Sequence, residues 1–290
     1  MKETKEITAL LHLIDDPDEE VYLSVRNKLL SFGKEVIPNL EYLWETTEDP
    51  LLQERIEMLI HSVQYEELKN KFTIWLQDDE PDLFTGLCML NSYHFPELSV
   101  DNISMQMEKL RRNIWLELNP YLTPLEQTNV LTGILFQYSQ FKKTPTDYGR
   151  PSDFLIAPLL ESKKGNALSL TLLQLSLAFL SEIPLQLLQM PGQLILGYFK
   201  GEKKFTHRNE PEHIPFFVDG GSGQIYSYKE IDMYLKNNEL EWKEDYFVAL
   251  TNKEIIALLI EEYASCFSSE ETAYKKTELK KLAKMIRAAT

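Results

Sequence analysis

The sequence predicts an α+β protein that is mostly helical, with a buried central helix packed on a small antiparallel sheet. Three observations predict this class. Apolar residues repeat with helical spacing through the first 140 residues, the central run LSLTLLQLSLAFL is apolar on nearly every face, and short runs of strand type come after it. We expect three parts: a helical region over residues 1–140, an α+β core over residues 141–240, and a helical pair over residues 241–290 packed on the core.

The N-terminal region is expected to form helical hairpins. Val21, Val25 and Leu29 repeat every four positions, after an N-cap and an acidic first turn at residues 16–18 and before Gly33. A second helix is expected at about Glu35–Trp44, and a third from Asp49-Pro50 to about Leu76.

The two Asp-Pro helix starts of this region suggest a repeat. They lie 33 residues apart, and each is followed by an arginine, Arg26 or Arg55. This spacing resembles a degenerate pair of HEAT-like hairpins. Because two units are too few for an independent solenoid, we expect them to pack on the next part of the chain.

Helices continue up to the core. They are expected at Leu83–Leu90, Ile103–Leu118, Leu125–Phe141 and, after a loop rich in proline and glycine, at about Asp153–Glu161. Gly165 and Asn166 then start the apolar helix, which must be buried on all sides. Beyond it, strands are expected at Leu185–Met190, Leu194–Phe199, Ile214–Val218 and Gln224–Tyr226, and helices at Ser227–Lys236 and within Lys253–Ile286.

The order of motifs from Phe141 to Ser227 resembles the SirB1-like branch of the transglutaminase-like superfamily. The matching motifs are Asp147-Tyr148 before an X-Pro-X-X turn, Leu160-Glu161, Lys163-Lys164-Gly165, Ser169-Leu170, Pro191-Gly192 before a strand, and Val218-Asp219 before glycines. The resemblance implies a papain-like core, in which the N-terminus of a buried helix carries a cysteine nucleophile and an antiparallel sheet carries histidine and aspartate. In such a layout the helix dipole stabilises the thiolate, and the aspartate orients the imidazole.

The sequence departs from this pattern at two of the three catalytic positions. The helix start, Gly165 to Ser169, contains no cysteine, and the Pro-Gly-His turn of the family reads Pro191-Gly192-Gln193. Only the acidic member is retained, as Asp219. Glutamine cannot act as a base near neutral pH, so Ser169 has no obvious group to accept its proton.

These departures favour a non-catalytic protein that binds or scaffolds an unknown protein or peptide partner through the degenerate cleft. We expect Asn166, Ser169, Gln193 and Asp219 to line that cleft. Two alternatives remain open. One is a hydrolase or acyl-transferase that uses Ser169 or an unrecognised nucleophile. The other is an interaction module whose acidic N-terminal face, with Glu19 and Glu20, binds a basic partner.

Composition excludes several other classes. The 290 residues carry a formal charge of −15, and residues 1–80 alone hold 19 acidic against 8 basic side chains. This charge opposes binding to nucleic acid, and no apolar stretch of about 18 residues predicts a membrane span. Cys88 and Cys266 are far apart, which favours a reducing, cytoplasmic location and buried thiols over a secreted disulfide scaffold.

No cofactor is expected. His207 and His213 flank two carboxylates within seven residues, a weak candidate for a zinc site. Their spacing matches no standard ligand motif, so a polar hairpin loop is the favoured interpretation. The glycines at 220, 221 and 223 lack the Lys-Ser/Thr of a P-loop and predict a tight turn.

Overall fold

The computed structural model describes residues 2–199 and 214–289 of the chain, which is a mostly helical α+β protein as predicted. Two compact units are present, Met1–Trp75 and Leu76–Thr290. The helices between residues 83 and 132 therefore fall in the second unit, whereas their helical character placed them in the expected N-terminal region over residues 1–140. No helix of the described ranges is both long and apolar enough to cross a membrane.

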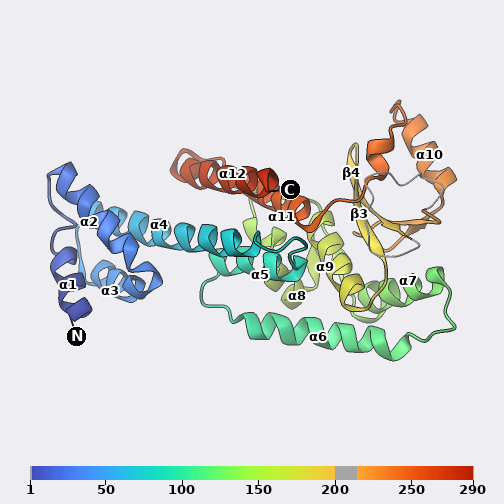
Figure 1. Cartoon of the computed structure of the whole chain (residues 1–290), viewed down its shortest axis with the longest axis horizontal. Coiled ribbons are helices and arrows are strands. Elements are labelled where there is room, and N and C mark those ends of the chain that lie inside the picture. Colours follow the sequence, from blue (N-terminus) through green and yellow to red (C-terminus); the bar gives the residue numbers. More distant parts are fainter. Residues whose placement is uncertain (1, 200–213, 290) are drawn as a thin grey trace. The chain divides into compact units, whose positions relative to one another are not determined.

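The first unit consists of four α-helices. They are α1 (Lys2–Leu11), α2 (Glu19–Ser31), α3 (Ile37–Thr46) and α4 (Pro50–Trp75), and a short 3-10 helix at Gly33–Val36 precedes α3 (Figure 1). Asp18 caps α2 by accepting a hydrogen bond from the N–H of Glu20 at 2.9 Å. Gly33 follows α2 with a φ of +61°, which confirms the predicted end of this helix. The core contains Ile7, Ile14, Val25, Leu29, Val36, Leu40, Ile56, Leu59 and Val63.

Both arginines of the suspected repeat bind within this unit. Arg55 Nη1 donates hydrogen bonds to the carbonyl oxygens of Ile14 at 2.9 Å and Asp16 at 3.2 Å, and its guanidinium lies over the ring of Tyr22. Arg26 Nη2 donates to Ser62 Oγ at 3.3 Å, which ties α2 to α4. The two cations thus satisfy polar groups within the unit.

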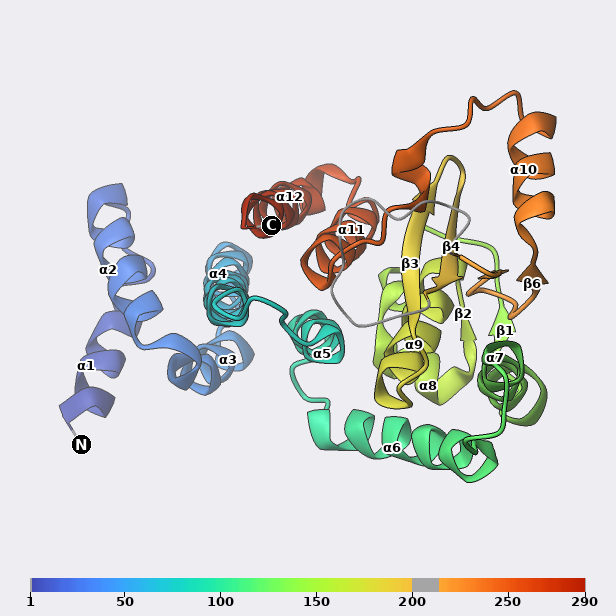
Figure 2. The same ribbon diagram turned by 45° about the vertical axis from the view of Figure 1, so that its right-hand side comes forward.

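The second unit is built around one helix, α9 (Ala167–Leu180). Every residue of α9 from Leu168 to Ala178 is buried, which confirms the predicted central helix. Three helices pack against it: α6 (Val100–Glu117), α7 (Pro124–Thr132) and α8 (Ile156–Ser162) (Figure 2). After Thr132 the expected α-helix becomes a π-helix at Gly133–Tyr138, in which Ser139 N–H donates to the carbonyl oxygen of Ile134.

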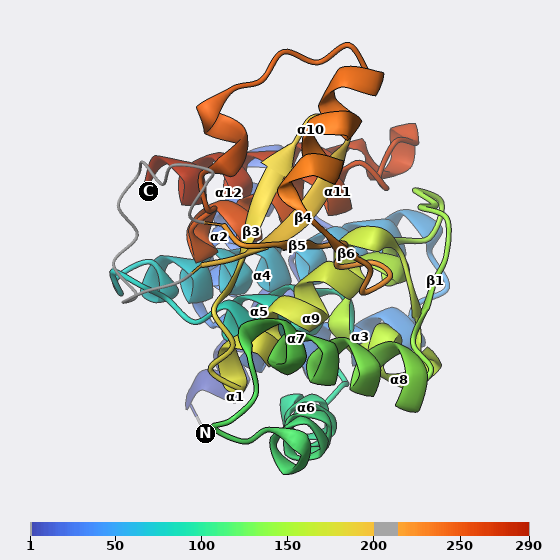
Figure 3. The same ribbon diagram turned by 90° about the vertical axis from the view of Figure 1, so that its right-hand side faces the viewer.

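A four-stranded antiparallel sheet packs against α9. Its order is β3 (Leu185–Met190), β4 (Gln193–Tyr198), β5 (Phe217–Val218) and β6 (Ile225–Tyr226), which confirms the predicted hairpins although β5 is shorter than expected. The opposite face of the sheet is covered by α10 (Tyr228–Asn237) and a 3-10 helix at Glu244–Phe247 (Figure 3). The buried residues on that face are Leu188, Met190, Ile195, Ile214, Phe217, Ile231, Leu235 and Phe247.

A second, two-stranded sheet was not predicted. Strand β1 (Lys142–Lys143) pairs in parallel with β2 (Lys164–Gly165), so that Lys143 lies opposite Gly165. The backbone N–H of Thr144 donates to the carbonyl oxygen of Gly165 at 2.8 Å. The pair fixes the chain directly before α9.

Two C-terminal helices form an antiparallel pair, as predicted. They are α11 (Asn252–Ala264) and α12 (Ala273–Ala288), and Arg287 of α12 binds both carboxylate oxygens of Glu261 at 2.9 and 2.8 Å. Helix α11 also packs on α5 (Leu83–His94), where His94 Nδ1 lies 2.6 Å from the hydroxyl of Tyr263.

Candidate functional site

The first turn of α9 is closed by its own side chains. Asn166 is the N-cap, and its Oδ1 accepts a hydrogen bond from the backbone N–H of Ser169 at 2.8 Å. The hydroxyl of Ser169 donates to the carbonyl oxygen of Asn166 at 3.2 Å. Asn166 has no exposed surface and Ser169 only 3%, so this hydroxyl is directed into the helix start and away from solvent.

Strand β2 leaves no room beside Ser169. A methyl group added to Gly165 would come within 2.6 Å of both Ser169 Oγ and Leu159 Cδ1. Atoms at that separation overlap, so the backbone of Gly165 covers the serine directly. A substrate carbonyl that approached Ser169 from this side would have to displace the strand.

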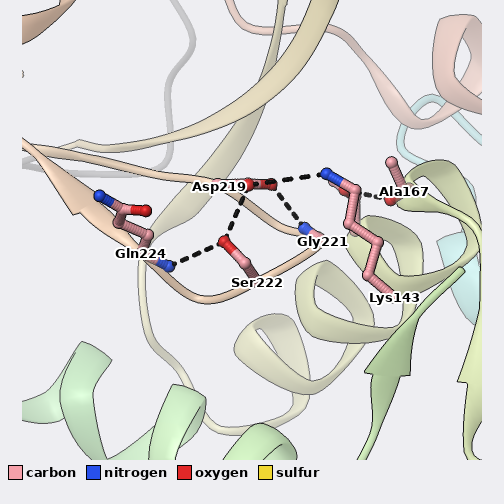
Figure 4. Close-up of polar contacts among 7 residues, drawn as sticks. Lys143, Ala167, Asp219, Gly221, Ser222 and Gln224 are labelled. Atoms are coloured by element: carbon pink, nitrogen blue, oxygen red, sulfur yellow. Dashed lines mark hydrogen bonds and ion pairs between the residues drawn. The ribbon is translucent and has the colours of Figure 1, made fainter. Parts of the chain in front are cut away.

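Asp219, the retained acidic residue, lies in the tight turn between β5 and β6 (Figure 4). Its Oδ1 accepts from the N–H of Gly221 at 2.8 Å, and its Oδ2 accepts from the Ser222 hydroxyl at 2.8 Å. Lys143 of β1 places its Nζ 3.8 Å from the same Oδ2. The carboxylate therefore organises its own turn and binds a lysine, whereas in the expected layout it orients an imidazole.

The turn also packs closely on α9. A Cβ at Gly220 would come within 2.4 Å of Thr171 Oγ1 and 2.7 Å of its backbone Cα. On its other side, a Cβ at Gly223 would come within 2.7 Å of the Phe136 ring. The backbone at Gly220 and Gly223 is thus wedged between the central helix and the π-helix, which fixes the position of Asp219.

Gln193 lies on the face of the sheet that packs with α10, opposite the face that packs with α9. It pairs with Met190 across the hairpin turn, and Ile195 pairs with Leu188. Met190, Leu188 and Ile195 all pack with the residues of α10, and side chains at alternate positions of a strand share a face. Gln193 is therefore on the α10 face. The alternate pair, Leu187 and Leu196, lies on the α9 face.

Of the four predicted cleft residues, the structure joins two directly. Asn166 and Ser169 are bonded to each other, and Asp219 reaches α9 only through the backbone contact at Gly220. In the described part of the chain, no hydrogen bond links Gln193 with Ser169 or Asp219. Sequence reasoning missed Lys143, whose only signal was its place next to a second lysine before the 144–151 loop.

A family model described as the transglutaminase-like superfamily matches residues 101–261. That span is more than half of the chain and includes α9, both sheets and the turn of Asp219. The chain belongs to the transglutaminase-like superfamily. No curated protein and no solved structure gave a significant match.

Neither cysteine of this transglutaminase-like protein is a candidate nucleophile. Cys88 lies within α5, and Cys266 lies in the turn after α11, beyond the C-cap residue Ser265, so neither is at the start of α9. Burial raises the pKa of each thiol to about 12, with a further contribution from Asp82 at Cys88 and from Glu262 at Cys266. Both thiols are therefore protonated at neutral pH, so neither supplies the thiolate that acts as a nucleophile.

No described histidine of the transglutaminase-like unit is placed as a base at α9. Among residues 76–199 and 214–289, the one histidine is His94, and its Nδ1 is bound to Tyr263. Burial, with a smaller contribution from Lys275, lowers the pKa of His94. His207 and His213, the weak zinc candidates, lie outside the described residues. Within those residues, no group of three or more His, Cys, Asp or Glu side chains is arranged to hold a metal ion.

Proposed function

We propose that this transglutaminase-like protein is a non-catalytic binding or scaffolding module. The observation that carries the proposal is the state of Ser169, whose hydroxyl is buried under Gly165 and bonded to the Asn166 carbonyl oxygen. An acyl-transfer nucleophile needs an accessible oxygen and a base within hydrogen-bond reach. Ser169 has neither among the described residues, and Gln193 lies on the other face of the sheet.

The proposed binding surface is the polar turn above α9. Its exposed or half-exposed groups are Lys143, Asp219, Ser222 and Gln224, which together offer a cation, a carboxylate and neutral donors and acceptors (Figure 4). Asn166 and Ser169 support this surface from beneath, because they fix the first turn of α9 on which Gly220 packs. A surface held by the wedged backbone at Gly220 and Gly223 is preorganised, which lowers the entropic cost of binding a peptide.

The finer assignments belong to the same proposal. The motifs quoted above support the SirB1-like branch, and the two arginine-tied hairpins of the first unit support a HEAT-like origin for α2 to α4. Two free thiols, Cys88 and Cys266, favour a reducing cytoplasmic location.

The catalytic alternative, a hydrolase or acyl-transferase using Ser169, is tested with activity-based probes. Purified protein is incubated with a fluorophosphonate and with an iodoacetamide probe, and turnover of amide and ester substrates is measured in parallel. We expect no labelling at Ser169 and no turnover. Labelling or turnover that disappears in Ser169→Ala would overturn the proposal.

The binding surface is tested by selection of peptides from a random library displayed on phage. Peptides enriched on the wild-type chain are expected to lose binding to a Lys143→Ala/Ser222→Ala variant. They are expected to keep it on Lys109→Ala/Ser269→Ala, a matched pair at exposed positions elsewhere. Peptide binding that is unchanged in the Lys143→Ala/Ser222→Ala variant would place the site away from the Asp219 turn.

A second candidate function is an interaction through the acidic face of the first unit. Glu19 and Glu20 are exposed in the first turn of α2 and form no ion pair with a described residue. Such carboxylates attract a basic partner. The test is retention of the full chain on an immobilised lysine-rich peptide. Reversal of Glu19 and Glu20 to lysine is expected to abolish retention at low salt, and unchanged retention would remove this face from consideration.

A further inference from the structure

Helix α12 has an apolar face and a basic face. Leu279, Leu282, Ala283 and Ile286 are buried, and the helix packs on α11. Two of its six basic residues are engaged: Arg287 binds Glu261, and Lys275 lies over the rings of Phe267 and Tyr274. The other four are Lys276, Lys280, Lys281 and Lys284, which we call the lysine stripe.

The lysine stripe forms no ion pair within the described residues. A nearby counter-charge is Glu261, whose pKa is lowered mainly by the bound Arg287 and also by Lys280. None of its four ammonium groups forms an ion pair or a hydrogen bond there, although the chain as a whole carries −15. Lys276, Lys280 and Lys284 recur every fourth residue and therefore lie along one side of the helix. Like charges at this spacing destabilise a helix by roughly 0.2–0.5 kcal/mol per pair. An anionic partner would remove that cost.

The first unit has the opposite imbalance. From residue 6 on, each of its lysines is paired with a glutamate: Lys28 with Glu6, Lys34 and Lys71 with Glu67, and Lys69 with Glu66. Arg26 and Arg55 are held by a hydroxyl and by carbonyl oxygens. Within residues 6–75, every lysine thus has a glutamate partner, whereas most of the carboxylates form no ion pair.

Some of those carboxylates form a row on α3. Glu41 and Glu45 are one turn apart on α3, exposed, and without an ion pair among the described residues. The exposed Glu48 lies beyond the helix end, after the extended C-cap residue Thr47. We call these three residues the acidic row. Tyr42, which is 70% exposed, lies beside it and offers apolar surface for burial.

We propose that the lysine stripe binds the acidic row of a second copy of this chain. The lysine stripe repeats a charge at each helical turn over roughly 12 Å, and Glu41 and Glu45 repeat one over a single turn of roughly 6 Å, with Glu48 beyond the end of α3. Unlike charges can therefore face one another along the two helices. The net charge of −15 disfavours the competing occupants, nucleic acid and an anionic membrane. Each contact joins unlike surfaces, so a closed pair of copies contains it twice. The acidic row does not include Glu19 and Glu20, so the proposal goes beyond the second candidate function and is independent of the Asp219 surface.

The test is sedimentation of the full chain at low and high salt. At about 0.01 M salt, where the Debye length is about 30 Å, we expect the mass to rise with concentration from the 33.9 kDa of one chain toward twice that value. At about 1 M salt the chain is expected to sediment as a monomer. A chain that is monomeric at low salt throughout would overturn the proposal.

Charge exchange identifies the surfaces. Lys276→Glu/Lys280→Glu/Lys284→Glu and Glu41→Lys/Glu45→Lys/Glu48→Lys are each expected to be monomeric, because stripe and row then have the same sign. An equimolar mixture of the two variants restores both contacts and is expected to form heterodimers. Circular dichroism verifies that each variant is folded, and glutamine versions replace any that is not.

A matched control separates this contact from net charge. Lys142→Glu/Lys163→Glu/Lys164→Glu changes the charge by the same amount at three exposed lysines that also form no ion pair with described residues. This variant is expected to dimerise like the wild type. Dissociation of this control variant, or failure of the mixture to associate, would overturn the proposal. If the wild-type chain is not retained on the lysine-rich peptide, that result bears only on the second candidate function.

Discussion

Gly220 packs so closely against Thr171 that no side chain fits between the turn of Asp219 and the central helix. A Cβ at position 220 would come within 2.7 Å of the Thr171 backbone Cα, an atom that cannot rotate away. The contact joins residues far apart in the sequence and holds the turn of Asp219 on α9. The position of Asp219 is therefore fixed by the packing of Gly220 on α9 as well as by the pairing of strand β5.

Gly220→Ala is therefore expected to lower the free energy of unfolding by about 1–3 kcal/mol, the range for overpacking a filled site. Urea denaturation measures the change. Gly133→Ala is the control, since an added methyl group at Gly133 meets no atom within 4 Å, and it is expected to be neutral or slightly stabilising. Equal destabilisation by both substitutions would contradict the close packing described for Gly220.

Introducing the missing catalytic cysteine and histidine is not expected to produce a reactive thiol at the start of α9. In a Ser169→Cys/Gln193→His variant the thiol lies under Gly165 and the imidazole lies on the α10 face. We expect the thiol at position 169 to react with iodoacetamide at least about tenfold more slowly than one introduced by Ser222→Cys, since each ~1.4 kcal/mol of local opening costs a factor of ten. Peptide mass spectrometry separates both from Cys88 and Cys266. A fast reaction at position 169 that depends on the introduced histidine would show that the two side chains meet.

The buried amide of Gln174 is expected to lower the free energy of unfolding. It is fully buried in α9, and neither its Oε1 nor its Nε2 has a hydrogen-bond partner in the described structure. Gln174→Met removes the unpaired amide at similar volume and is expected to raise the free energy of unfolding by about 1–3 kcal/mol. Thermal and urea denaturation give the value. Destabilisation would instead show that the amide binds an internal water molecule.

Stability is expected to fall as the pH drops below about 6.5 because of His94. Burial, followed by Lys275, lowers the pKa of His94 below its ordinary value of 6.5, so the unfolded chain binds a proton more readily than the folded chain. The full contribution is present above pH 6.5 and is lost as the pH falls through the depressed folded pKa. Denaturation at several pH values between about 8 and 5 should show a steeper loss for the wild type than for His94→Gln. Parallel curves would mean that this imidazole does not contribute.

The elements that could be predicted from the sequence are those whose burial is local. The central helix was found from its start at Gly165-Asn166 because LSLTLLQLSLAFL has no polar face, and the hairpin at Pro191-Gly192 because two apolar runs flank a turn. Composition cannot show a two-residue strand, so the pairing of Lys143 with Gly165 was missed. The Lys143–Asp219 ion pair spans 76 positions, and no local pattern connects its members.

The face occupied by Gln193 shows a different limit. Residue type alone placed this glutamine in the cleft through its match to a histidine position. A strand's two faces differ only by one step of register, and that step is set by the pairing of Met190 with Gln193. The turn can be predicted from the sequence. The packing of Met190 and Ile195 with α10, which determines the face on which Gln193 lies, cannot.

The β1–β2 pair closes a loop of the chain at its base. The backbone bonds from Lys142 to Lys163 and from Thr144 to Gly165 hold the two ends of the 144–163 segment together, independently of the length between them. Doubling the flexible part of such a loop costs only about 0.6 kcal/mol. The exposed residues near Pro145 are therefore a suitable place to insert an epitope tag or a fluorescent reporter while the helix start at Asn166 stays as it is.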